Sequence, residues 1–176
     1  MIKKILIFAL LFCEPVFSHT AHYINISKIE MQVLRNGKII GFSNYLFSYK
    51  DKMFEVKNST QFDVKLFDVT VFKIKSKSIE TYRENQLIKF NSKTNQNDKI
   101  KFVELSFDKD QKKFIINGSS FVGMAEMENI IGNWWNHDIL NAKSQISPLS
   151  GSVKKQEVKF IKNEDVTING ITYELE

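Results

Sequence analysis

Residues 79–99 read IETYRENQLIKFNSKTNQNDK, and this stretch decides the fold. Glu80 and Tyr82 have the same parity and precede residues 84–86, which read Glu-Asn-Gln. That triplet predicts a tight turn, because Asn tolerates left-handed backbone angles. The apolar residues that follow predict a returning strand, and residues 94–98 predict a second polar turn. The stretch therefore predicts three consecutive strands joined by two turns.

The strand period of two extends outward over residues 23–107. Alternating apolar residues from 29 to 33 lead into Asn36-Gly37, which is the strongest short signal for a type I′ hairpin turn. The apolar parity changes shortly afterwards, which predicts a β-bulge near Ser43, with Gly41 contributing. A second Asn-Gly pair, Asn117-Gly118, predicts another hairpin turn. Hairpins at this spacing predict an antiparallel meander.

Residues 62–74 are apolar in both parities. This pattern predicts either a central strand buried on both faces or a strand kinked across a barrel corner. Taken together, the chain predicts a mainly β fold, with a single antiparallel, strongly curved sheet or an incomplete β-barrel.

The strand period breaks after residue 123. Apolar residues at helical spacing predict one short helix around residues 126–131, with an irregular loop as the alternative. A second short helical piece, capped by Asn136, is a further option over residues 138–143. Strands are predicted again at residues 153–161, 166–168 and 171–175. The fold prediction therefore includes one or two short helices.

Residues 1–18 have the order of a signal peptide. Lys3 and Lys4 precede an apolar run, and Ser18 ends a segment suited to cleavage. The run is shorter than the ~20 residues of a membrane helix, so no transmembrane span is expected after cleavage. The prediction is a periplasmic or secreted protein with a single β domain over residues 19–176. Acylation of Cys13 stays an open alternative, although Phe12 before it disfavours a lipoprotein signal.

The C-terminus also leaves an alternative open, because the chain ends in mid-alternation at Glu176. Truncation there would expose a sheet edge.

The net charge is +5, and lysine supplies almost all of the positive charge, since Arg35 and Arg83 are the only arginines. Lysine lacks the bidentate fork that favours phosphate and base recognition, and the lysines are spread along the chain. Nucleic acid is therefore not an expected partner.

Several short motifs resemble the signature of a domain-of-unknown-function family of exported bacterial proteins. They are Glu80-x-Tyr82-x-Glu84-Asn85-Gln86-Leu87, Ser92-x-Thr94, Asn97-Asp98 and Trp135-Asn136. The family pattern is Glu-x-Trp-x-Asp-Gly-x-Leu, Ser-x-Thr, Asn-Gly and Trp-Asn, so this chain departs from it at Tyr82, Asn85-Gln86 and Asp98. The resemblance covers most of the chain after about residue 29. It implies antiparallel β architecture and brings no activity with it.

The chain has no Gly-x-Ser-x-Gly motif, and its only cysteine lies in the predicted signal peptide. A catalytic triad could use only His137, and His137-Asp138 falls short of a zinc ligand set. We therefore expect no metal, no cofactor and no catalytic residue, with an enzymatic role ranked last among the function classes.

The candidate binding residues are Glu80, Tyr82, Ser92, Thr94, Trp134, Trp135 and Asn136. The two tryptophans could stack a sugar or a lipid headgroup. The alternative, which we favour, is that Trp135 closes one end of the sheet together with Tyr82 and Glu80, while Trp134 lies half-exposed. Glu80 could act with Glu84 as an acid/base pair. The alternative, which we favour, is that Glu80 pairs across strands with a lysine or with the hydroxyls of Ser92 and Thr94.

The chain contains 15 phenylalanines, an excess for a β protein of this size. A curved sheet would line its concave face with them. This predicts a non-enzymatic binder of a lipid or another apolar or amphiphilic ligand. The alternative is a structural or interaction module of the cell envelope, with a filled core and an envelope protein as partner.

Overall fold

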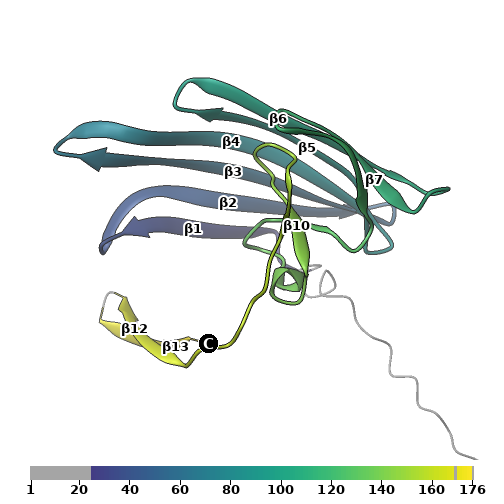
Figure 1. Cartoon of the computed structure of the whole chain (residues 1–176). Helices are drawn as coiled ribbons and strands as arrows, with labels where there is room; N and C mark the ends of the chain where they lie inside the picture. The colour runs from purple at the N-terminus through teal and green to yellow at the C-terminus, as the bar shows by residue number, and fades with distance from the viewer. Residues whose placement is uncertain (1–24, 169, 176) are drawn as a thin grey trace, which may run out of the picture.

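The computed structural model describes residues 25–168 and 170–175. Its main element is an eight-stranded antiparallel sheet in which each strand pairs with the next along the chain (Figure 1). The strands are β1 (Lys28–Arg35), β2 (Lys38–Lys50), β3 (Met53–Leu66), β4 (Val69–Arg83), β5 (Gln86–Gln96), β6 (Lys99–Asp108), β7 (Lys113–Gly118) and β8 (Phe121–Glu126). The sheet is open, with β1 and β8 as its edges. The predicted mainly β, antiparallel meander is confirmed.

Two-residue turns join the first six strands. Both turn residues have positive φ at Asn36-Gly37, Asp51-Lys52, Phe67-Asp68, Glu84-Asn85 and Asn97-Asp98. Positive φ at both positions is the geometry whose twist matches that of paired strands. The turns predicted within residues 79–99 are therefore confirmed.

The central strand predicted over residues 62–74 is wrong, because a hairpin turn at Phe67-Asp68 divides this stretch into the end of β3 and the start of β4. Phe67 is 92% exposed, and Leu66 and Val69 are also exposed. The apolar residues lie at an exposed hairpin tip, where both faces of the strands are open to solvent. Periodicity alone cannot distinguish such a tip from a strand buried on both faces.

The turn predicted at Asn117-Gly118 lies two residues further on. Gly118 still pairs with Phe121, so the turn residues are Ser119 and Ser120. A Cβ atom at Gly118 would lie 2.5 Å from the backbone oxygen of Ser150. This glycine therefore permits the close approach of another segment. The bulge predicted near Ser43 lies a few residues earlier on β2. The register of β1 and β2 shifts between Val33 and Leu34, which pair with Gly41 and Ile39.

The helix predicted over residues 126–131 is wrong. Glu126 ends β8, and a turn leads into the short strand β9 (Ile130–Ile131). This strand pairs in parallel with β10 (Ser144–Ile146), which pairs with β11 (Val153–Lys155). Backbone pairing with a distant strand outweighs the local helical spacing. The alternative helical piece is a 3₁₀ helix, η2 (His137–Leu140), with the Asn136 side chain accepting a 3.0 Å hydrogen bond from the Asp138 amide.

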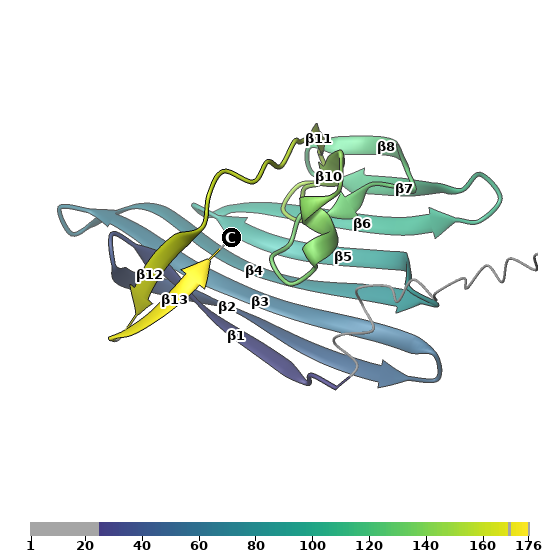
Figure 2. The same ribbon diagram turned by 90° about the horizontal axis from the view of Figure 1, so that it is seen from below.

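Residues 130–155, here called the cover segment, lie against one face of the sheet (Figure 2). The apolar core fills the space between them. Its most buried members from the sheet are Val56, Phe90, Val103, Phe114 and Ile116, and from the cover segment Ile131, Trp135 and Ile146.

The final hairpin, β12 (Glu164–Ile168) and β13 (Ile171–Leu175), stands apart from the sheet (Figure 1). Among the described residues, no helix is long and apolar enough to cross a membrane. The predicted signal peptide and Cys13 lie outside the described residues.

Candidate functional site

Glu80 is the buried polar centre of the contact between sheet and cover segment. It lies on β4 and is 1% exposed. Its carboxylate accepts hydrogen bonds from the Tyr82 hydroxyl at 2.5 Å, the Trp135 indole Nε1 at 3.0 Å and the Asn133 amide at 3.1 Å. One donor comes from the same strand and two come from the cover segment. A buried carboxylate with three donors therefore fastens the cover segment to the sheet.

Burial also sets the ionisation of this group. Loss of hydration raises the pKa of the Glu80 carboxyl to about 7, while the hydrogen bonds from Tyr82, Trp135 and Asn133 act in the opposite direction. Burial, followed by the negative charge on Glu80, raises the pKa of the Tyr82 hydroxyl. Glu80 therefore changes charge near neutral pH, whereas Tyr82 stays protonated and remains a donor.

The two adjacent tryptophans have different environments. Trp135 is 1% exposed, and its ring makes edge contacts with Phe47, Phe54 and Tyr82 at centroid distances of 5.6–6.0 Å. Trp134 is 59% exposed. The favoured prediction, a buried Trp135 beside a half-exposed Trp134, is confirmed by these exposures. Aromatic edge contacts of this kind stabilise the core beyond the area they bury.

A row of hydroxyl groups crosses the covered face of the sheet next to Glu80. Ser43, Thr60, Ser76 and Thr94 are consecutive cross-strand partners on β2 to β5. Ser43 and Thr60 are joined by a 2.7 Å hydrogen bond, and so are Ser76 and Thr94. Because side chains alternate between faces, Ser76 shares the inner face of β4 with Glu80. The row is a polar strip inside an otherwise apolar interface.

A second polar row lies on the same face, between these hydroxyls and the position of Glu80 on β4. Its members Tyr45, Asn58, Ser78 and Ser92 are again cross-strand partners. Asn58 donates to the Ser43 oxygen at 3.1 Å, and Ser92 donates to the Pro148 carbonyl at 2.5 Å. The Tyr45 oxygen accepts from the Trp134 amide at 3.4 Å. The second row therefore connects the polar strip to the cover segment.

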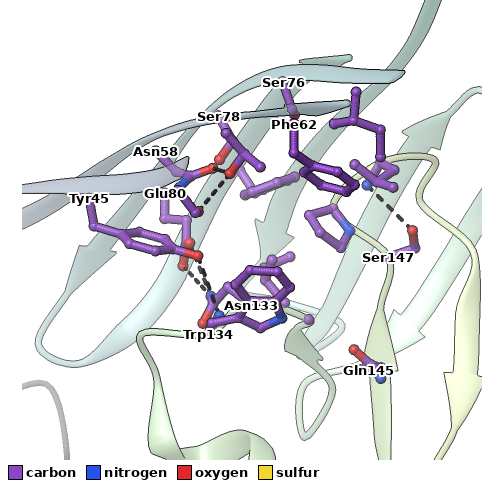
Figure 3. Close-up of a pocket in the computed structure, with 18 of the residues that line it drawn as sticks. Tyr45, Asn58, Phe62, Ser76, Ser78, Glu80, Asn133, Trp134, Gln145 and Ser147 are labelled. Carbon is purple, nitrogen blue, oxygen red and sulfur yellow. Dashed lines mark hydrogen bonds between the residues drawn. The ribbon is translucent and has the colours of Figure 1, made fainter. Parts of the chain in front are cut away.

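These rows form the floor of a pocket of about 310 Å³ between the sheet and the cover segment (Figure 3). Figure 3 shows Tyr45, Asn58 and Glu80 on the sheet side and Trp134 on the cover side. The polar lining comprises Ser43, Asn58, Thr60, Ser76, Ser78, Asn133, Gln145 and Ser147, and the apolar lining comprises Phe62, Ile74, Phe90, Ile131, Pro148 and Leu149. Glu80 lines the pocket at one end, and Lys154 contributes the positive charge. Apolar side chains flank the polar rows, with Phe62 and Ile74 on one side and Phe90, the cross-strand partner of Glu80, on the other.

The predicted site residues separate into three groups. Glu80, Tyr82 and Trp135 come together in one hydrogen-bonded cluster, and Asn136 is buried close to it as the cap of η2. Trp134 and Glu80 line the pocket. Ser92 and Thr94 are buried on β5 in the polar rows, outside the pocket lining. The predicted cross-strand pairing of Glu80 with a lysine or with the Ser92 and Thr94 hydroxyls is wrong. Glu80 accepts instead from Tyr82 on its own strand and from the cover segment, while Ser92 bonds to Pro148 and Thr94 to Ser76.

The sequence analysis did not identify Asn133, nor the polar side chains of β2 to β4 that form the two rows. Asn133 carried no signal except that it precedes the Trp134-Trp135 pair. Ser76 and Ser78 carried one, because they share the parity of Glu80 along the strand. The predicted Phe-lined concavity contributes only Phe62 and Phe90 to the pocket, which is more polar than expected.

A family model described as a domain of unknown function, DUF6134, matches residues 31–176. The chain belongs to this family. The match extends from β1 to the final hairpin, so it includes the sheet and cover segment of this DUF6134 member. The predicted membership of a domain-of-unknown-function family is confirmed. No curated protein and no solved structure matches the chain.

Among the residues that the structure describes, no group of three or more His, Cys, Asp or Glu side chains could hold a metal ion. The pocket lining offers hydroxyl and amide groups for hydrogen bonding, apolar side chains, the carboxyl of Glu80 and the ammonium group of Lys154.

Proposed function

We propose that this protein binds a small amphiphilic ligand, without catalysing a reaction, in the pocket between the sheet and the cover segment. The observation that carries the proposal is the mixed polar and apolar lining of that pocket. Hydroxyl groups of Thr60 and Ser78 line it together with the apolar side chains of Phe62, Ile74 and Leu149. Ligand pockets typically combine an apolar wall with a few placed polar groups.

The pocket volume limits the size of the ligand. A volume of about 310 Å³ lies at the lower end of the ~300–1,000 Å³ that is typical of small-molecule pockets. This suits one short acyl chain with a polar head, and it is too small for a lipid with two long chains. The uncharged hydroxyl and amide groups favour a hydroxyl-bearing head, such as that of a monoacylglycerol.

Trp134 supplies a direct readout of binding. It lines the pocket and is 59% exposed, whereas the chain's other tryptophan, Trp135, is 1% exposed. An amphiphile in the pocket should shift the emission of Trp134 to shorter wavelength. We expect titration with octanoylglycerol to give a saturable shift, and Trp134→Phe to lose it while the protein still binds.

A matched pair of variants tests the location. Ser78→Leu fills the pocket floor from the inner face of β4, and Ser106→Leu adds the same side chain at an exposed position on β6. We expect the first to abolish octanoylglycerol binding and the second to leave it unchanged. Equal affinity in both variants would contradict the proposal. Mass spectrometry of an organic extract of the purified protein should also detect a co-purified amphiphile.

The second candidate is an interaction module of the cell envelope. The edge strand β8 favours it, because Val122 is 75% exposed and Met124 is 51% exposed there. An unpaired edge with apolar side chains can accept a strand from another chain. We include export as part of both proposals, on the basis of the signal-peptide pattern in residues 1–18. N-terminal sequencing of the secreted product should begin at or near His19, and an intact Met1 would contradict export.

A further inference from the structure

The face of the sheet opposite the pocket carries a cluster of lysines. Three of them, Lys73, Lys75 and Lys77, alternate with inward residues along β4, and two, Lys89 and Lys93, do so along β5. All are exposed. These lysines are separated in the sequence, but antiparallel pairing of β4 with β5 gathers them on one surface, here called the lysine face.

Lys77 lies directly opposite Lys93 in the β4–β5 register. Like charges at opposite cross-strand positions destabilise a sheet. Their next neighbours across the sheet are Ser59 on β3 and Phe102 on β6, neither of which is acidic. Within residues 25–168, none of the ion pairs that form involves the lysine face. Within residues 25–168, no ion pair therefore offsets the repulsion between Lys77 and Lys93 directly.

Acidic residues lie at the margin of the lysine face. Asp63 is the cross-strand partner of Lys73, and Glu104 is the partner of Asn91. None of them is a direct cross-strand partner of Lys75, Lys77 or Lys93. Glu104 lies diagonal to Lys93, and its carboxylate accepts a 3.0 Å hydrogen bond from Asn117 on β7. The surface therefore presents a positive centre, which attracts an anionic partner.

A shallow hollow adjoins Lys77 on this face, and two exposed apolar side chains lie among its mostly polar lining. Its lining includes Lys57 and Lys77 together with Leu46 and Ile79. Leu46 is 52% exposed and Ile79 is 39% exposed, and Phe102, beside Lys93, is 39% exposed. Lysines interleaved with exposed apolar residues are the composition of surfaces that bind at a lipid headgroup layer.

We propose that the lysine face docks the protein on an anionic lipid bilayer. The lysines would contact the headgroup phosphates, while Leu46, Ile79 and Phe102 contact the upper part of the acyl region. Lysine is a point charge that suits a layer of mobile phosphates, and the centre of this face carries lysine rather than the arginine fork preferred for nucleic-acid recognition. The proposal does not depend on the pocket, which opens on the opposite side of the sheet.

Flotation with vesicles tests the docking. We expect the protein to float with phosphatidylcholine vesicles that contain phosphatidylglycerol and not with phosphatidylcholine alone. Added salt should release it, because the Debye length shortens. Each lysine near an anionic surface contributes about fivefold to binding, so Lys75→Gln/Lys77→Gln/Lys93→Gln should weaken binding on the order of a hundredfold.

A charge-matched control separates the face from the net charge. Lys38→Gln/Lys109→Gln/Lys143→Gln removes the same charge from exposed positions away from the face, and it should bind nearly as the unmodified protein does. The first variant should melt at the same or a higher temperature, since it removes the Lys77–Lys93 repulsion. Equal weakening in both variants, binding to phosphatidylcholine alone, or retention on an acidic protein or DNA without vesicle binding would overturn the proposal. Octanoylglycerol binding should be unchanged in both variants. A failure of the bilayer-docking proposal can therefore be distinguished from a failure of the proposal that the pocket binds an amphiphile.

Discussion

The indole Nε1 of Trp135 donates a 3.0 Å hydrogen bond to the Glu80 carboxylate, although the two residues are 55 positions apart. The bond is buried, and it joins the cover segment to the middle of the sheet. The pocket lies beside it, so the same contact that closes the core also positions one wall of the candidate site. The stability of the core and the shape of the pocket are therefore linked through Glu80.

Replacing each tryptophan in turn should show which of the two stabilises the fold. Trp135→Ala removes a 1% exposed ring and should lower the free energy of unfolding by about 3–5 kcal/mol. Trp134→Ala removes a 59% exposed ring and should change it by less than about 0.5 kcal/mol. Urea denaturation followed by circular dichroism measures both. Similar losses in the two variants would mean that Trp135 is not the anchor.

Glu80→Gln should alter how stability depends on pH. The folded-state pKa of Glu80 is raised from 4.5 to about 7, so the folded protein holds this proton more tightly than the unfolded chain does. The contribution is therefore most favourable below pH ~4.5 and declines as pH rises to ~7, by about 3 kcal/mol in total. Glu80→Gln keeps a neutral side chain throughout and should lack this decline.

The measurement is the difference between the two unfolding free energies across that pH range, because other carboxyl groups titrate equally in both proteins. The unfolding free energy of Glu80→Gln should increase relative to that of the unmodified protein as pH rises. Parallel curves from pH ~4 to ~8 would show that Glu80 does not titrate in this window.

The buried hydroxyl pair should show coupling. Ser76 and Thr94 share a 2.7 Å hydrogen bond inside the interface. Ser76→Ala or Thr94→Val alone leaves a buried hydroxyl without its partner and should cost about 1–3 kcal/mol. The double variant should cost less than the sum, with an interaction of at least about 0.5 kcal/mol. Strict additivity in a double-mutant cycle would argue against a direct bond.

Gly118→Ala should displace the loop that follows β10. A Cβ atom there would lie 2.5 Å from the Ser150 backbone oxygen, a distance that forces backbone movement. We expect a loss of about 1–3 kcal/mol from this overpacking. Gly123→Ala on the next strand is the control, because its Cβ would meet only the Phe121 ring, at 3.0 Å. Thermal denaturation of the pair should show the larger loss at Gly118.

Some features of the fold could be predicted from local sequence. The alternation around Glu80 and the turn at Glu84-Asn85 were sufficient for the hairpins of β4 to β6, because strand period and turn angles are properties of neighbouring residues. The helix predicted over residues 126–131 was wrong because local spacing does not report pairing with a distant strand. Its spacing was helical, but pairing of Ile131 with Ile146 decided the conformation.

The sequence by itself determined the meander, the positions of most turns and the contrast between Trp134 and Trp135. Only the tertiary structure decided which distant residues meet. Asn133 reaches Glu80 across 53 positions, and Ser43, Thr60 and Ser76 form one row only because three strands share a register. Lys77 and Lys93 likewise become neighbours through pairing. Such contacts depend on the packing of whole elements against each other, and no local pattern of residues encodes that packing.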